Sequence, residues 1–171
     1  MVKVKNMSSL MLHGFNILNL FLPSSRCHGL KCYLLRLAGA SIGKNVRILR
    51  GVNISMAGKL VVGSNTHFGE FVSILSGECY IVIGNNVDIG PHVKIIGGTH
   101  LQDSSVKAAG TDVSYHIAIS DGCWLGANCV ILGGVDLNSR VIVGASALVN
   151  NSFDHDTTIG GVPARVIRKS L

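Results

Sequence analysis

Residues 81–100 read IVIGNNVDIGPHVKIIGGTH, and within them an aliphatic residue returns every six positions, at Ile83, Ile89 and Ile95. A period of six matches neither the 3.6-residue period of an α-helix nor the two-residue period of a flat strand. It is typical of a β-solenoid, in which each short flat face contributes one inward-pointing aliphatic side chain. This stretch therefore predicts a coiled, all-β architecture.

The same period extends through most of the chain and carries two companion patterns. The aliphatic or near-aliphatic positions are Val62, Phe68, Ile74, Ile83, Ile89, Ile95, Ile119, Leu125, Ile131, Leu137, Val143 and Val149. Gly follows at Gly43, Gly63, Gly69, Gly84, Gly90, Gly126 and Gly144. A small or β-branched residue follows four places on, at Val46, Val52, Thr66, Val72, Val87, Val93, Cys123, Cys129, Val135, Val141 and Ala147. We expect the aliphatic and small residues to fill the interior and the glycines to permit tight corners.

Composition agrees with one narrow, stacked domain. The 171 residues are 47% hydrophobic but only 5% aromatic, and they include 21 Gly. The net charge of +6 comes without a Lys/Arg run or interleaved aromatics, so nucleic-acid binding has no support. Cys123 and Cys129 occupy small-residue positions of the repeat, which favours buried thiols over a metal site or disulfide. No cleavable leader is recognisable, and a cytoplasmic location is expected.

The two ends of the chain leave the period. Residues 7–22 are apolar but contain His13, Asn16 and Asn19, and they are too short for a membrane span. With a second helix expected at about residues 28–38, they are interpreted as a cap on the solenoid end. Contact with a membrane surface is the alternative. The predicted divisions are a helical segment at 1–40, a β-helix at 41–156 with an insertion at about 97–117, and a tail at 157–171.

The period breaks between Ile95 and Ile119. Gly97-Gly98-Thr99-His100 ends one block, and a mostly polar stretch follows before the repeat resumes. Long excursions from a compact scaffold are uncommon and often functional. His100 at the rim of the excursion is a candidate general base, because imidazole exchanges protons near neutral pH. An ordinary surface histidine is the alternative interpretation.

Four stretches carry a resemblance to a known family. They are LLRLAGASIGKNVRI at 34–48, IVIGNNVDIGPHVKIIGGTH at 81–100, IAISDGCWLGANCVILGGV at 117–135 and IGGVPARVIR at 159–168. The chain resembles the left-handed β-helix hexapeptide-repeat acyltransferases, particularly the saccharide O-acetyltransferases. The resemblance implies left-handed coils, an exception to the right-handed crossover rule. It also implies a homotrimer with active sites between subunits, and acetyl-CoA as co-substrate without a metal.

The same resemblance implies roles for individual residues. His100 matches the catalytic His, and Trp124 matches a Trp near the coenzyme A arm. Coenzyme A would further meet Gly126, Ala127, Gly144, Ala145, Gly161, Pro163 and Ala164, with Arg165, Arg168 and Lys169 toward its phosphates. Glu70 stands where galactoside-specific relatives have an acceptor-contacting Asn. An ionised carboxylate there cannot donate a hydrogen bond, but it could orient His100 or bind a sugar hydroxyl.

The implied reaction moves an acetyl group from acetyl-CoA to a hydroxyl of a capsular, lipopolysaccharide or related glycan. His100 would act as general base and the transfer would be direct. The alternatives are an N-acetyltransferase acting on a nucleotide-linked amino sugar and, from another class, a non-catalytic solenoid scaffold. Zinc hydration chemistry is not expected, because His67, His92, His100 and His116 lack a His-x4-His spacing. The apolar N-terminal segment and Glu70 favour a lipid-linked or polymeric acceptor at the inner face of the membrane.

Overall fold

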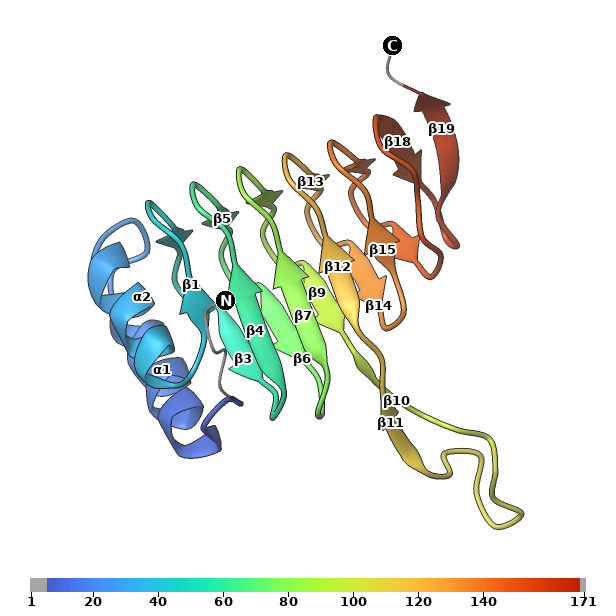
Figure 1. Ribbon diagram of the computed structural model, residues 1–171, viewed down its shortest axis with the longest axis horizontal. Helices are drawn as coiled ribbons and strands as arrows, with labels where there is room; N and C mark the ends of the chain where they lie inside the picture. The colour runs from blue at the N-terminus through green and yellow to red at the C-terminus, as the bar shows by residue number, and fades with distance from the viewer. Residues whose placement is uncertain (1–5, 170–171) are drawn as a thin grey trace.

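The computed structural model describes residues 6–169, and short parallel strands on three faces form its body (Figure 1). The first face contains β1 (Ser41–Ile42), β4 (Lys59–Val62), β7 (Tyr80–Ile83), β12 (Ile117–Ile119) and β15 (Asp136–Leu137). The second contains β2 (Arg47–Ile48), β5 (His67–Phe68), β8 (Asp88–Ile89), β13 (Trp124–Leu125), β16 (Ile142–Val143), β18 (Thr157–Gly160) and β19 (Arg165–Lys169). The third contains β3 (Asn53–Ser55), β6 (Ser73–Leu75), β9 (Lys94–Ile96), β14 (Val130–Leu132) and β17 (Leu148–Val149). Equivalent positions of successive coils therefore form columns along each face.

The interior is built from the residues that the six-residue period selects. Every aliphatic position of the period, from Val62 to Val149, is at most 3% exposed. Thr66 is the one polar residue in the small-residue set, and its hydroxyl donates to the Gly84 carbonyl at 2.8 Å. The Cys123 and Cys129 thiols are free and buried, and burial raises the pKa of Cys129 to about 12. The predicted solenoid core is confirmed.

The repeated glycines serve close packing between coils. A Cβ atom on Gly63 would lie 2.4 Å from the carbonyl carbon of Gly84 in the next coil, and the backbone of Gly63 does not have a positive φ. The left-handed backbone conformation falls two residues later, on Asn45, Asn65 and Asn86, with φ between 54° and 58°. Asn tolerates this conformation better than most residues, and these three side chains form a ladder with 3.1 and 3.3 Å hydrogen bonds. The glycines are thus required by stacking and not by the backbone angle of the corner.

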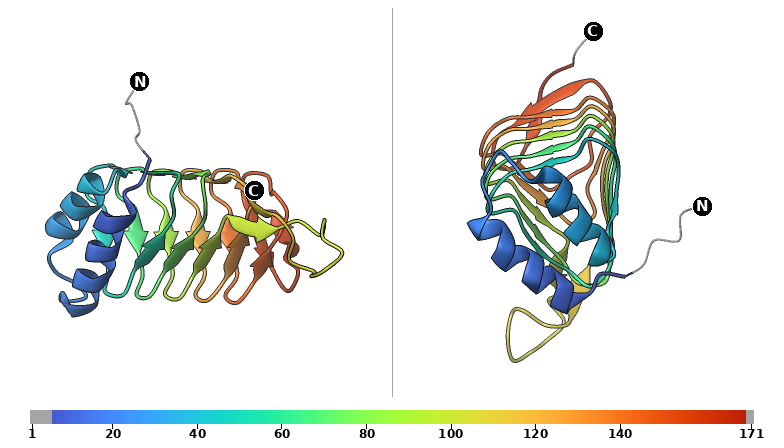
Figure 2. Two further views of the ribbon diagram at one scale, coloured as in Figure 1. Left: turned by 90° about the horizontal axis from the view of Figure 1, so that it is seen from below. Right: turned by 90° about the vertical axis from the view of Figure 1, so that its left-hand side faces the viewer.

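Helices α1 (Ser9–Phe21) and α2 (His28–Leu37) form an end cap over the first coil (Figure 2). The two asparagines that interrupt the apolar stretch face this coil. Asn16 exchanges hydrogen bonds of 2.9 and 3.0 Å with the backbone of Ile54, and the Asn19 amide donates to the carbonyls of Leu49 and Val52. Backbone groups at a solenoid end otherwise lack a partner coil. The polar positions of α1 therefore complete the edge of the stack.

A buried lysine fastens the end cap from the side of α2. Lys31 is 0% exposed, and its ammonium donates to the carbonyls of Pro23, Ser24 and Ile48 at 3.0 to 3.3 Å. Burial lowers the pKa of Lys31, while the three carbonyl oxygens use its three N–H donors. The linker between the helices is thereby tied to the first coil.

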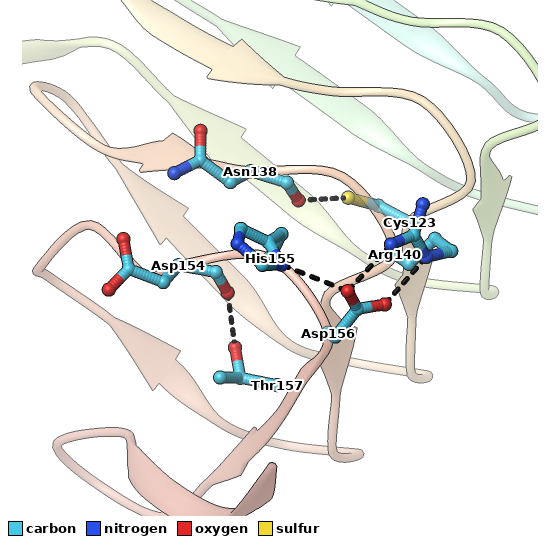
Figure 3. A network of polar contacts seen from close by, with 7 residues as sticks. All are labelled: Cys123, Asn138, Arg140, Asp154, His155, Asp156 and Thr157. Carbon is cyan, nitrogen blue, oxygen red and sulfur yellow. Dashed lines mark hydrogen bonds and ion pairs between the residues drawn. The ribbon is translucent and has the colours of Figure 1, made fainter. Parts of the chain in front are cut away.

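The C-terminal end of the stack closes differently. β18 adds a parallel strand beside β16, and β19 folds back antiparallel on β18, so residues 157–169 extend the second face. At the last corner, Arg140 makes two hydrogen bonds of 2.5 and 2.6 Å to Asp156, which also contacts His155 (Figure 3). The Arg140 hydrogen bonds, followed by that of His155, lower the pKa of Asp156 to about 2. This exposed network joins two successive corners.

We predict that Gly63→Ala lowers the free energy of unfolding by about 1–3 kcal/mol, because the added methyl group overlaps the Gly84 backbone. Gly14→Ala in α1 is the matched control. No atom lies within 4 Å of the added Cβ there, and helix propensity should stabilise the protein by about 0.5–1 kcal/mol. Urea unfolding at one fixed protein concentration measures both. A Gly63→Ala protein as stable as the wild type would contradict the stacking requirement.

Candidate functional site

The excursion between the third and first faces is an antiparallel hairpin that projects from the body (Figure 1). Its strands are β10 (Gly98–His100) and β11 (Asp112–Ser114), with Gly98 opposite Ser114 and His100 opposite Asp112. The intervening segment is mostly exposed, and Asp103 ties it together through hydrogen bonds of 2.9 and 2.6 Å from Thr111. A rigid solenoid edge thus carries His100 on a short, defined stem.

The antiparallel pairing brings an acid to His100. The Nδ1 atom of His100 lies 2.8 Å from an Asp112 carboxylate oxygen, and both side chains are exposed. A carboxylate only accepts hydrogen bonds, so this contact places the proton of a neutral imidazole on Nδ1. The lone pair is then on Nε2, the tautomer that a general base requires. Sequence reasoning missed Asp112, because its partnership depends on hairpin register and not on the six-residue period.

A hollow of about 490 Å³ lies on the second face. Its walls include Leu49, His67, Glu70, Asp88, Pro91 and Trp124, which come from four successive coils. The register explains the grouping, because His67 and Trp124 both pair with Asp88 as neighbours in one outward-facing column. His100 does not line this hollow. The hairpin leaves the body at a different corner of the prism.

His67 and Asp88 give the hollow a polar wall. The Nδ1 atom of His67 lies 3.8 Å from Asp88, and its Nε2 atom is buried without a hydrogen-bond partner among the described residues. Burial, followed by the charge of Arg47, lowers the pKa of His67 and so favours its neutral imidazole. Sequence reasoning did not select either residue for this site. Their outward positions at the six-residue spacing, beside the Trp124 position, were the available signal.

Glu70 lies on the corner that follows β5 and lines the hollow. Its carboxylate accepts a hydrogen bond from the Ser24 hydroxyl in the linker of the end cap. Within the described chain, the carboxylate beside His100 is that of Asp112 and not that of Glu70. An orienting role of Glu70 toward His100 remains a prediction, whereas its place in the hollow makes it a candidate ligand contact.

The remaining predicted residues follow Trp124 along successive coils. Trp124 is 55% exposed at the hollow, and Ala127 and Ala145 occupy equivalent exposed corners after it. The N–H groups of Gly126 and Gly144 donate to ladder carbonyls, those of Val143 and Ile159. The corner N–H groups of Ala127 and Ala145 have no such acceptor within residues 6–169. They are therefore candidates for binding a ligand.

The last predicted group surrounds the turn between β18 and β19. Gly161 and Pro163 are exposed, and Ala164 is buried. Arg165 and Arg168 extend from the exposed strand β19, and the Arg168 side chain donates a hydrogen bond to the Thr158 hydroxyl at 3.4 Å. Two cations thus stand at the far end of the row of corners. No set of three His, Cys, Asp or Glu side chains within the described residues is placed to hold a metal ion.

Comparison with known sequences gives clear relatives, although no protein-family model matches the chain. It is 32% identical over 145 residues to an Escherichia coli protein named "Putative colanic acid biosynthesis acetyltransferase WcaF", covering 82% of this chain and 75% of that protein. It is 30% identical over 141 residues to the galactoside O-acetyltransferase of Lactococcus lactis, and this match covers 80% of this chain and 66% of that protein. The chain spans only 54% of the length of a Schizosaccharomyces pombe relative, with which it shares 33% identity over 112 residues.

Solved structures share the fold. A galactoside acetyltransferase in complex with coenzyme A superposes with a TM-score of 0.75 at 24% identity, covering 94% of this chain and 77% of that one. A hexapeptide-repeat acetyltransferase from Vibrio cholerae, complexed with acetyl coenzyme A, superposes with a TM-score of 0.71 at 22% identity. The match covers 95% of this chain and 87% of that one. The predicted left-handed parallel β-helix is confirmed. The chain belongs to the left-handed β-helix hexapeptide-repeat acyltransferase family and, within it, resembles the saccharide O-acetyltransferases.

Proposed function

We propose that the chain transfers an acetyl group from acetyl-CoA to a hydroxyl of a saccharide, such as a capsular, lipopolysaccharide or related glycan. The single observation that carries the proposal is the His100–Asp112 pair on its hairpin, in a chain related to sugar acetyltransferases. A reducing compartment, the cytoplasm, suits an enzyme whose five cysteines are all free thiols.

In this mechanism the Nε2 atom of His100 takes the proton of the acceptor hydroxyl as the oxygen attacks the thioester carbonyl carbon. Asp112 holds the imidazole in the required tautomer. A free corner N–H, that of Ala127 or Ala145, would donate to the oxyanion of the tetrahedral intermediate. The C–S bond then breaks, and His100 returns its proton to the coenzyme A thiolate. The thioester is already activated, so no covalent enzyme intermediate is required.

Coenzyme A would follow the row of corners on the prism. Trp124 would flank its thioester arm, and Gly126, Ala127, Gly144 and Ala145 would line the pantetheine path. Gly161, Pro163 and Ala164 would meet the adenine end, and the exposed Arg165 and Arg168 would pair with phosphates, for which guanidinium groups are suited. This arrangement leaves the hollow beside Glu70 and Asp88 for the acceptor.

We propose that the hairpin of one copy of the chain meets the hollow of another. His100 does not line the hollow of its own protomer, and the hairpin projects beyond the prism. A closed C3 trimer would set the hairpin of one copy against the second face of the next, repeating the same contact three times. The likeness to this family, and the exposed apolar Trp124 wall, support the trimer.

An N-acetyltransferase acting on a nucleotide-linked amino sugar is the second candidate. The observation that favours it is the presence of two carboxylates, Glu70 and Asp88, in the hollow, because such a pair would attract an ammonium substituent. A screen that offers acetyl-CoA with glycan hydroxyl acceptors and with amino-sugar nucleotides separates the two. Absence of turnover with both classes would instead favour a non-catalytic scaffold.

His100→Ala is expected to lower kcat by about 10²–10⁴ with the fold intact, the usual effect of removing a general base.

Asp112→Asn should lower kcat by a smaller factor with little change in KM, and Asp112→Glu should restore part of the loss. In the double variant with His100→Ala, loss of Asp112 should have no further effect. Asp154→Asn removes an exposed carboxylate that lies outside the hairpin, just before β18, and is the control. Steady-state kinetics that leave His100→Ala near wild-type activity would exclude its catalytic role.

Glu70→Gln keeps the size of the side chain and removes its charge. If Glu70 accepts a hydrogen bond from the acceptor, KM for the acceptor should rise by roughly tenfold or more, with kcat little changed. KM for acetyl-CoA is the internal control and should stay constant. A fall in kcat at constant KM would instead indicate that Glu70 orients His100. Unchanged constants would remove Glu70 from the site.

The assembly prediction concerns mass in solution. Multi-angle light scattering should give three times the chain mass of 18.0 kDa at assay concentrations. An active monomer under these conditions would contradict a site shared between copies.

A further inference from the structure

The end cap exposes an apolar surface on the side away from the solenoid. On α1, Leu10, Ile17 and Phe21 share the helix face opposite the buried Leu12 and Phe15, and Leu10 and Phe21 are 79% and 83% exposed. On α2, the exposed large hydrophobic side chains are Leu30, Tyr33 and Leu37, and their spacing puts them on one face of the helix. We call these six residues the outer face. Several large apolar side chains exposed on two packed helices indicate an interaction site.

The inner sides of the same helices already complete the solenoid end. Asn16, Asn19 and Lys31 satisfy its backbone carbonyls, and Leu12 and Phe15 are buried against it. The outer face therefore contributes nothing to capping. Its apolar side chains need a separate physical reason.

The charged residues of the end cap and the first coil are all Lys or Arg. The first 69 residues contain nine of the 15 Lys and Arg residues and none of the nine Asp and Glu residues; the nine are Lys3, Lys5, Arg26, Lys31, Arg36, Lys44, Arg47, Arg50 and Lys59. Among the described ones, Arg26, Arg36, Lys44, Arg47 and Arg50 are exposed on the cap or the first coil. All the acidic residues lie from Glu70 onward. The excess of positive charge thus lies in the N-terminal part of the chain, whereas residues from Glu70 onward contain six Lys and Arg against nine Asp and Glu.

We infer that the outer face docks onto an anionic lipid surface. Exposed apolar helix faces, on an end of the molecule whose charged residues are all cations, suit an interfacial position in which the apolar face enters the headgroup boundary. Each nearby Lys or Arg strengthens binding to an anionic bilayer. Among the described helices, none is long and apolar enough to cross the bilayer. A second copy of the chain fits less well, because two positive ends would repel each other.

This docking would set the hollow close to the membrane. Ser24 in the cap linker donates to Glu70, and the hollow spans coils that each rise by about 4.8 Å. If the proposed function holds, a glycan attached to a membrane lipid would present its first sugars at the height of the hollow. The acceptor class would then be a lipid-linked saccharide.

Vesicle co-sedimentation of the purified full chain tests the docking. Vesicles of phosphatidylcholine with roughly 30% phosphatidylglycerol should bind the wild type, neutral phosphatidylcholine vesicles should bind it far less, and raising salt should weaken binding. Phe21→Ser should weaken binding by about tenfold, from the lost burial of one aromatic side chain. Val106→Ser is the matched control and should bind as the wild type does, because Val106 is 92% exposed but lies on the excursion.

Three results would overturn the docking: no binding to anionic vesicles, equal binding to neutral vesicles, or equal losses for Phe21→Ser and Val106→Ser. If the wild type does not bind vesicles, and Phe21→Ser lowers the molar mass measured by light scattering, the outer face contacts another copy of the chain instead. Turnover with a water-soluble acceptor is measured in parallel. Phe21→Ser should retain it, so the docking and the proposed function can fail separately.

Discussion

The spacing between coils is the constraint on which the rest of the structure depends. Parallel neighbouring strands lie about 4.8 Å apart, so every coil must present the same outline to the coil above and below it. A Cβ atom on Gly43, Gly63 or Gly84 would overlap the corner of the next coil, and the first three coils have Gly at this corner. The interior positions likewise hold apolar side chains, although their size varies from Val143 to Phe68. The six-residue period in the sequence follows from this constraint.

The same stacking positions functional groups outside the prism. Side chains at one outward position of successive coils line up without further design, and His67, Asp88 and Trp124 meet in this way on the second face. A side chain can be placed outside these columns only by a segment that loops out of the coils. The hairpin that carries His100 is such a departure, and the antiparallel pairing of its strands supplies Asp112. The repeating body thus forms a wall, and the interruption carries His100, the proposed general base.

The sequence is sufficient for the features that the repeat dictates, and insufficient for those that depend on contacts outside it. The burial of Cys123 and Cys129 could be predicted because they occupy defined interior positions. The Asp112 contact could not, because the period carries no information on hairpin register. The glycines were expected to supply the backbone conformation of the tight corner, yet Asn45, Asn65 and Asn86 adopt the positive φ. Asn16 and Asn19 read as interruptions of an apolar helix until the carbonyls of the first coil are seen opposite them.

The central claim is that the hairpin of one copy and the hollow of the next form one site. Subunit mixing tests it most directly, with His100→Ala in one chain and Glu70→Ala/Trp124→Ala in the other, each inactive alone. In randomly assembled trimers at equal amounts, half the hairpins and half the hollows are intact, so about a quarter of the wild-type turnover should return. Turnover no greater than that of the separate variants would contradict the account and place the whole site within a single chain.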